Sequence, residues 1–215
     1  MVQINTDMTP KELMDRLLPE LISSKLAGVS FGPIRDTVQI HIPDTGHWAA
    51  LIENGTVSIR PGKSEMAYVT VVLPPGALMT ALERAASEAG DLDAIDISGP
   101  LQTATGFITQ ELIDSLRAQI QGTIRFTLTT ASGTDESLFV GFGGINTDAP
   151  TCTVQTSETD LLDIVEKGQS PQEAFMAGKV RLDGDMSILM GLVANVLPLI
   201  DTGMTFLKSY MKERR

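Results

Sequence analysis

Hydrophobic and polar residues alternate along several short stretches of the chain, and each stretch predicts a β-strand. The clearest are "TVQIHI" at 37–42, "TIRFTL" at 123–128 and "KVRLD" at 179–183. In the last of these, Val180 and Leu182 fall on one face while the charged residues fall on the other. The expected sheet therefore has one apolar face and one polar face exposed to solvent.

Segments with helical spacing of apolar residues separate these strands. Thr9 and Glu12 form a capping-box pattern with Pro10 at the first helical position, which predicts a helix start. Further helices are expected at 75–85 and 158–168. The apolar face of the first helix consists of Leu13, Leu17, Leu18 and Leu21.

The chain contains an internal repeat. "KELMDRL" at 11–17 recurs as "QELIDSL" at 110–116, and the predicted strands and helices that follow keep the same order in both halves. Two copies are expected, at 1–107 and 108–215, each of the usual size of a small domain. Strands adjacent in sequence and helices grouped together predict an α+β fold, an open α/β layer with helices on one side of the sheet.

Composition narrows the range of functions. The formal net charge of −11 argues against nucleic acid, which needs clustered Lys and Arg. A single cysteine, Cys152, allows no internal disulfide and favours a reducing compartment, so a cytoplasmic location is expected. The N-terminal residues lack the pattern of a signal peptide. The apolar run 188–200 is too short to span a bilayer.

Catalytic and metal-binding patterns are weak. The two histidines of the chain, His41 and His47, have no cysteine near them, so no zinc site and no other cofactor is expected. A nucleophilic Cys152 would need a nearby base, and the second half contains no histidine. The "AGKV" segment lacks the glycine and the hydroxyl residue of a phosphate loop. We expect a protein that is not an enzyme.

The second half carries a distinctive set of residues: Ser170-Pro171-Gln172, Ala174-Phe175, Gly178-Lys179 and Gly184-Asp185. Through these residues it resembles the sterol carrier protein 2 (SCP2) family of lipid-transfer domains. The first half is similar to the same family more weakly, through Trp48, Asn54-Gly55 and "VTVVLPPGALMTAL". It has "DLDAIDI" where the second half carries its signature.

The resemblance implies two tandem units, each a five-stranded sheet with helices over one face enclosing an apolar tunnel. The expected ligand is a fatty acid, acyl-CoA, sterol or other isoprenoid or acyl lipid. Residues 108–215 are the expected lipid-binding copy and 1–107 a degenerate one. The tunnel is expected to be lined by Phe139, Phe142, Leu161, Ile164, Val165, Phe175, Met176, Val180, Leu182, Met186, Leu189, Met190 and Val193.

Two other functions remain open. The units could form a non-catalytic scaffold or accessory subunit of a lipid-modifying system, as SCP2-like domains do in quinone synthesis and alkyl sulfatases. A hydrolase acting on an acyl substrate is the third hypothesis, and it lacks a nucleophile–base pair. The C-terminal segment 204–215 has an apolar helical face and a basic end. This pattern fits a lid that transiently touches anionic membrane, and equally a plain packing helix with a solvated basic end.

Overall fold

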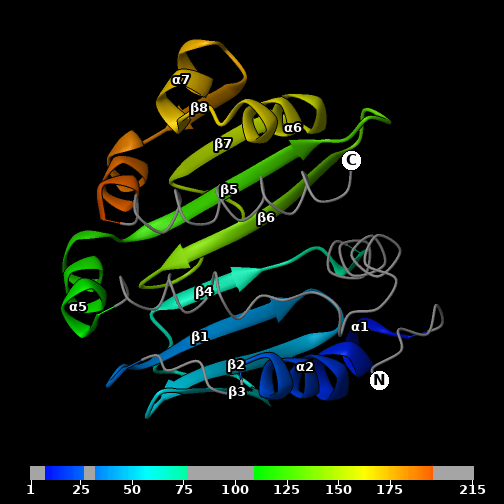
Figure 1. Ribbon diagram of the computed structural model, residues 1–215, viewed down its shortest axis with the longest axis vertical. Coiled ribbons are helices and arrows are strands. Elements are labelled where there is room, and N and C mark those ends of the chain that lie inside the picture. Colours follow the sequence, from blue (N-terminus) through cyan, green and yellow to red (C-terminus); the bar gives the residue numbers. More distant parts are fainter. Residues whose placement is uncertain (1–7, 27–31, 77–108, 196–215) are drawn as a thin grey trace. The chain divides into compact units, whose positions relative to one another are not determined.

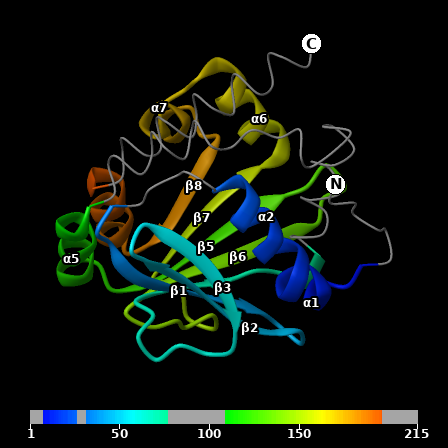
Figure 2. The same cartoon turned by 60° about the horizontal axis from the view of Figure 1, so that its bottom comes forward.

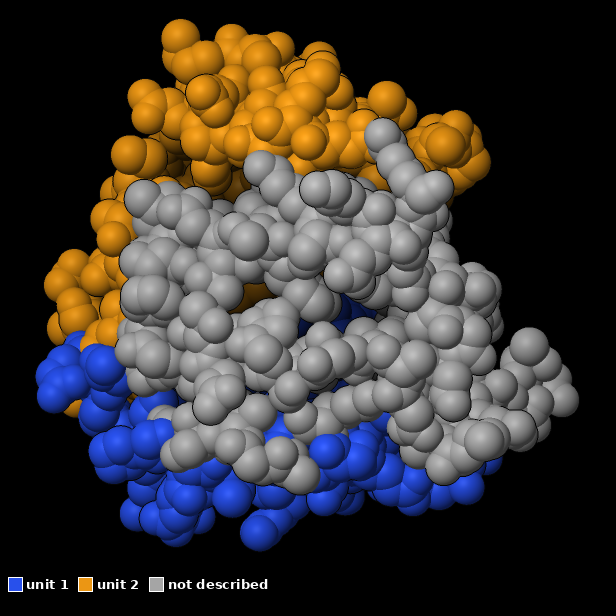
Figure 3. Space-filling view, viewed as in Figure 1, with its two compact units in different colours: residues 1–111 blue, residues 112–215 orange. Residues whose placement is uncertain are grey.

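The computed structural model describes residues 8–26, 32–76 and 109–195 of the chain (Figure 1). The chain divides into two compact units, residues 1–111 and 112–215 (Figure 3). Each unit combines strands with helices, so the expected α+β class is confirmed. Most of the helix expected at 75–85 and the lid expected at 204–215 lie outside the described residues.

The first unit begins with three consecutive helical segments: α1 (Pro10–Glu12), the π-helical η1 (Leu13–Leu17) and α2 (Leu18–Lys25). The expected capping box is present. The Glu12 amide donates to Thr9 Oγ1 at 3.2 Å, and the Thr9 amide donates to Glu12 Oε2 at 2.9 Å. These two bonds satisfy amide groups that the first turn leaves without helical partners.

The strands of the first unit are β1 (Arg35–Ile42), β2 (Gly46–Glu53), β3 (Thr56–Pro61) and β4 (Val69–Val72). They lie in the order β3-β2-β1-β4, with β4 parallel to β1 and the other pairs antiparallel. Asn54 and Gly55 both take positive φ, 53° and 77°, as a two-residue hairpin turn requires.

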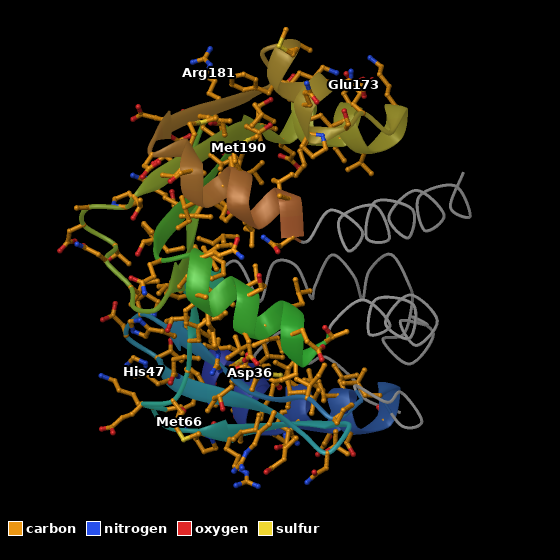
Figure 4. The ribbon with its side chains drawn as sticks, turned by 90° about the vertical axis from the view of Figure 1, so that its left-hand side faces the viewer. Asp36, His47, Met66, Glu173, Arg181 and Met190 are labelled. Atoms are coloured by element: carbon orange, nitrogen blue, oxygen red, sulfur yellow. The ribbon has the colours of Figure 1, made fainter. Side chains whose placement is uncertain are left out.

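The second unit begins within helix α5 (Gln110–Gln119), since the boundary between the units falls after residue 111. Its strands are β5 (Gly122–Thr129), β6 (Asp135–Phe142), β7 (Cys152–Ser157) and β8 (Val180–Gly184). They lie in the order β6-β5-β7-β8, with β7 parallel to β5 and the other pairs antiparallel. Helices α6 (Glu158–Lys167) and α7 (Pro171–Met176) and a helical segment at 186–195 lie on one side of this sheet (Figures 2 and 4).

The two units share a three-strand arrangement in which a hairpin is extended by a parallel strand: β2-β1-β4 and β6-β5-β7. The registers also correspond. Ile40 pairs with Trp48 and Val71, and Phe126 pairs with Leu138 and Val154. Strand β3 has no counterpart among the described residues of the second unit, where 143–151 contain no strand. The shared part agrees with the repeat found in the sequence.

The core of the first unit is built around Trp48, which is 1% exposed and packs with Met14 and Ile42. Leu18, Ile40, Ile59 and Leu73 close the space around these residues. The Trp48 indole Nε1 donates to Asp15 Oδ1 at 2.6 Å. The Lys11 ammonium and then this indole lower the pKa of Asp15. The large ring thus fills the interior and its polar atom is satisfied.

Candidate functional site

An apolar face covers one side of the sheet in the second unit. The pairing registers place the even-numbered residues of β5, β6, β7 and β8 together on this face. Ile124, Phe142 and Cys152 are buried. Seven other apolar side chains of this face are only half-buried: Phe126, Leu128, Leu138, Val140, Val154, Val180 and Leu182.

The helices lie over this apolar face. A Cβ added at Gly122, which shares the face, would come 3.3 Å from the Cδ1 atom of Ile188 in the segment 186–195. In α6, Ile164 and Val165 are buried, and Leu161 lies one turn before them on the same helical side. Leu161 is nevertheless 41% exposed. The inward side of α6 is therefore incompletely packed.

The segment 186–195 has two apolar sides. Ile188 is buried, and a Cβ at Gly191 would contact Ile120 at 3.7 Å, so this side is packed against the chain just before β5. Helical spacing puts four expected lining residues on the other side: Met186, Leu189, Met190 and Val193. Three of them are half-buried and Met190 is 61% exposed. Figure 4 shows Met190 on the side of the segment toward α6 and α7.

Three of the expected lining residues are placed differently. Phe139 pairs with Arg125 on the opposite, polar face of the sheet, where the guanidinium lies 5.8 Å from the centre of its ring. Met176, which was expected to line the tunnel, points away from the packed side of α7, because its side chain is 78% exposed. Phe175 is 44% exposed, and α7 packs instead through Ala174, which is fully buried. Phe142, Val180 and Leu182 share the apolar face.

The residues that carry the family resemblance shape the corner between α6, α7 and β8. Ser170 caps α7: the Glu173 amide donates to Ser170 Oγ at 3.2 Å, and the Ser170 amide donates to Glu173 Oε2 at 2.8 Å. The Lys179 ammonium donates to the Asp163 carboxylate and to Gln169 Oε1. Lys179 directly precedes β8, so this ion pair links the start of that strand to α6 beside the apolar face.

Gly184 ends β8 where no other residue fits easily. Its φ is +93°, and a Cβ there would lie 2.5 Å from the Thr151 carbonyl oxygen. Asp185 follows it: the Asp185 amide donates to the same carbonyl at 2.8 Å, and its Oδ1 accepts from the Ser187 amide at 2.9 Å. The pair therefore turns the chain from β8 into the segment 186–195.

Gly184→Ala is expected to destabilise the second unit. The strained φ alone costs about 1–3 kcal/mol, and the contact with Thr151 adds to it. The control is Gly133→Ala, where φ is +80° but nothing lies within 4 Å of the added Cβ. Urea unfolding should show a clearly larger loss for Gly184→Ala. Equal losses would show that the close approach to Thr151 has no energetic consequence.

The carboxylate of Asp163 gives the corner a pH dependence. Lys167 and then Lys179 lower the pKa of Asp163. Because the pKa of this carboxyl is lower in the folded chain than in the unfolded chain, where it is about 3.9, the ionised carboxylate stabilises the fold at higher pH. This stability is lost as the pH falls through the pKa of the folded state. The melting temperature of Asp163→Asn should be lower than wild type at pH 7, and the difference should shrink below about pH 4. A difference that stays constant with pH would contradict this account.

Nucleophilic chemistry has little support at this site. Burial, and then the charges of Asp185 and Asp183, raise the pKa of Cys152, whose side chain is 1% exposed. Its thiol therefore stays protonated near neutral pH.

Within 8–26, 32–76 and 109–195, no three His, Cys, Asp or Glu residues lie close enough together to hold a metal ion. None of the helices in those ranges is long and apolar enough to cross a membrane.

Comparison with known proteins finds one matching family. Residues 109–196, less than half of the chain, match the SCP-2 sterol transfer family. The resemblance read from residues 170–185 is confirmed for this half. No curated protein matches the chain significantly.

Several solved structures are similar to part of the chain. Sterol Carrier Protein 2 Like 2 from Aedes aegypti has 23% identity, covers 40% of this chain and 93% of its own, and gives a TM-score of 0.29. Sterol Carrier Protein 2 from Yarrowia lipolytica has 20% identity, coverage of 41% and 86%, and a TM-score of 0.30. The UbiJ-SCP2 ubiquinone synthesis protein has 16% identity, coverage of 56% and 98%, and a TM-score of 0.33.

Sequence reasoning missed part of the apolar face. Phe126, Leu138, Val140 and Val154 share it with Leu182 but were not among the expected lining residues. The signal was present, because "TIRFTL" alternates and Phe126 falls on its apolar side. The strand register decides which residues of β6 and β7 share the apolar face with Phe126. The alternation within one strand does not define that register.

Proposed function

We propose that the second unit binds one lipid hydrocarbon chain between the apolar face of its sheet and the helices above it. The observation that carries this proposal is the incomplete burial of that face. Seven apolar side chains in the sheet remain half-buried beneath helices, and Leu161 on the inward side of α6 is 41% exposed. Protein interiors normally pack densely, so apolar side chains left open between two layers favour a guest.

The energy available from this arrangement is sufficient. Burying a sixteen-carbon chain gains roughly 12 kcal/mol at about 0.8 kcal/mol per methylene. Part of that gain is lost with the freedom of the ligand, which leaves a dissociation constant in roughly the micromolar to nanomolar range. The ligand class is a fatty acid, acyl-CoA, sterol or other isoprenoid or acyl lipid. The protein acts as a carrier, without a catalytic step.

The first unit is proposed to be a diverged copy of the same fold with a closed interior. Its three-strand arrangement and register correspond to those of the second unit. At the register position where β6 has Leu138, β2 has Trp48. Its ring belongs to a hydrophobic cluster with six other apolar residues of the sheet and helices. The first unit thus serves mainly a structural role, and binding is unequal between the copies.

A binding titration tests this proposal. The purified full chain is stripped of lipid and titrated with a fluorescent fatty acid such as cis-parinaric acid. The proposal predicts saturable binding of one probe per chain, displaced by palmitate. A non-catalytic scaffold with closed interiors would show no saturable binding, and that result would overturn the proposed function.

A further inference from the structure

The two histidines of the chain lie side by side in the first unit. The antiparallel register of β1 and β2 pairs His41 directly with His47. Their imidazole rings are stacked, with centroids 4.1 Å apart and planes inclined by 14°. Both side chains are half-exposed. They lie on the face of the sheet opposite Trp48, because Trp48 pairs with Ile40 in the same strands.

The backbone that carries these rings is held on both sides. The Gly62 amide donates to the His47 carbonyl oxygen at 2.8 Å, on the β3 side. The Leu73 amide donates to the His41 carbonyl oxygen at 3.0 Å, on the β4 side. The Cβ positions of the two histidines are therefore fixed at the close spacing of a cross-strand pair.

We propose that His41 and His47 form a two-imidazole binding site for a divalent late transition-metal ion. Imidazole nitrogen suits Zn²⁺, Ni²⁺ and Cu²⁺, and Cu²⁺ is bound most tightly in this series. Rotation of the stacked rings about their side-chain bonds directs one nitrogen of each toward a shared ion. No third His, Cys, Asp or Glu joins them within the described ranges, so water completes the coordination shell.

A neighbouring positive charge tunes the proposed site. Lys63 follows Gly62 in the loop beside His47, and its charge acts on that imidazole. An ammonium near a bound cation opposes binding. The site is consequently weaker than one with three or four protein ligands, and removing this lysine charge strengthens it. The site is on the first unit and does not depend on the lipid proposed for the second.

Titration with CuCl₂ tests the site, with Trp48 as an internal reporter. Trp48 is the one tryptophan of the chain and adjoins His47, so bound Cu²⁺ is expected to quench its emission in a saturable way. His41→Gln and His47→Gln should each weaken binding by at least about tenfold, since each removes one of two ligands. Lys63→Met should tighten it. EDTA should restore the emission.

The controls separate this site from other copper ligands and from misfolding. All variants are made in a Cys152→Ser background, and circular dichroism verifies that each is folded. Zn²⁺, which does not quench, should shift the imidazole C2–H proton signals of both histidines in NMR spectra. Undiminished Cu²⁺ binding by the two glutamine variants, or unshifted imidazole signals, would overturn the proposal.

Discussion

Leu138→Trp is expected to weaken fatty-acid binding by at least about 100-fold, a loss of roughly 2.7 kcal/mol, while the chain stays folded. Leu138 lies on the half-buried apolar face and pairs with Phe126. At the corresponding register position of the first unit, Trp48 pairs with Ile40 and is 1% exposed. The substitution therefore fills the second unit with a side chain that the first unit already accommodates.

The measurement is displacement of cis-parinaric acid, with circular dichroism to verify folding. Gln155→Trp is the matched control, because Gln155 lies on the polar face of β7 next to Val154, and it should leave the affinity unchanged. If Leu138→Trp fails to fold, Leu182→Trp fills the same face from β8. Unchanged binding in a folded variant with Trp on the apolar face would place the lipid elsewhere.

Trp48→Ala is expected to lower the free energy of unfolding by about 3–5 kcal/mol. The indole is the largest buried side chain of the first unit, and it packs with Met14 and Ile42. Its removal leaves a cavity and also takes away the hydrogen bond to Asp15. Such a loss is a large fraction of the free energy of unfolding of a typical domain, which is about 5–15 kcal/mol.

Urea unfolding followed by circular dichroism measures this loss. Met66→Ala is the control, since Met66 is 73% exposed and its truncation should change stability by less than about 0.5 kcal/mol. Where Trp48→Ala is still folded, its fatty-acid affinity should equal that of the wild type. A loss below about 1 kcal/mol would show that Trp48 does not close the first unit.

Much of the fold follows from local patterns in the sequence. Alternation predicts β1, β5 and β8, the capping box predicts the start of α1, and Asn54-Gly55 predicts the hairpin turn. These features depend on neighbouring residues, so a single sequence defines them. The same alternation separates Phe139 from Phe142, because residues an odd number of positions apart fall on opposite faces. That reasoning excludes Phe139 from the apolar face.

Features that depend on distant partners could not be predicted in this way. Met176 and Ala174 occupy the same short helix, and the way α7 packs decides that Ala174 is buried and Met176 exposed. His41 and His47 are stacked because the turn between β1 and β2 sets their register. The burial of Trp48 depends on the fit of the first helices against the sheet, and the half-burial of Leu138 depends on how the helices of the second unit lie over its sheet.

Native mass spectrometry of the freshly purified full chain tests the central claim most directly. A carrier should retain one lipid per chain, visible as a mass increment of an acyl or isoprenoid compound that is released by activation in the gas phase. Leu138→Trp, purified in the same way, should appear at its own sequence mass without the increment. A wild-type chain that carries no lipid, and takes up none after incubation with palmitate, would contradict the account.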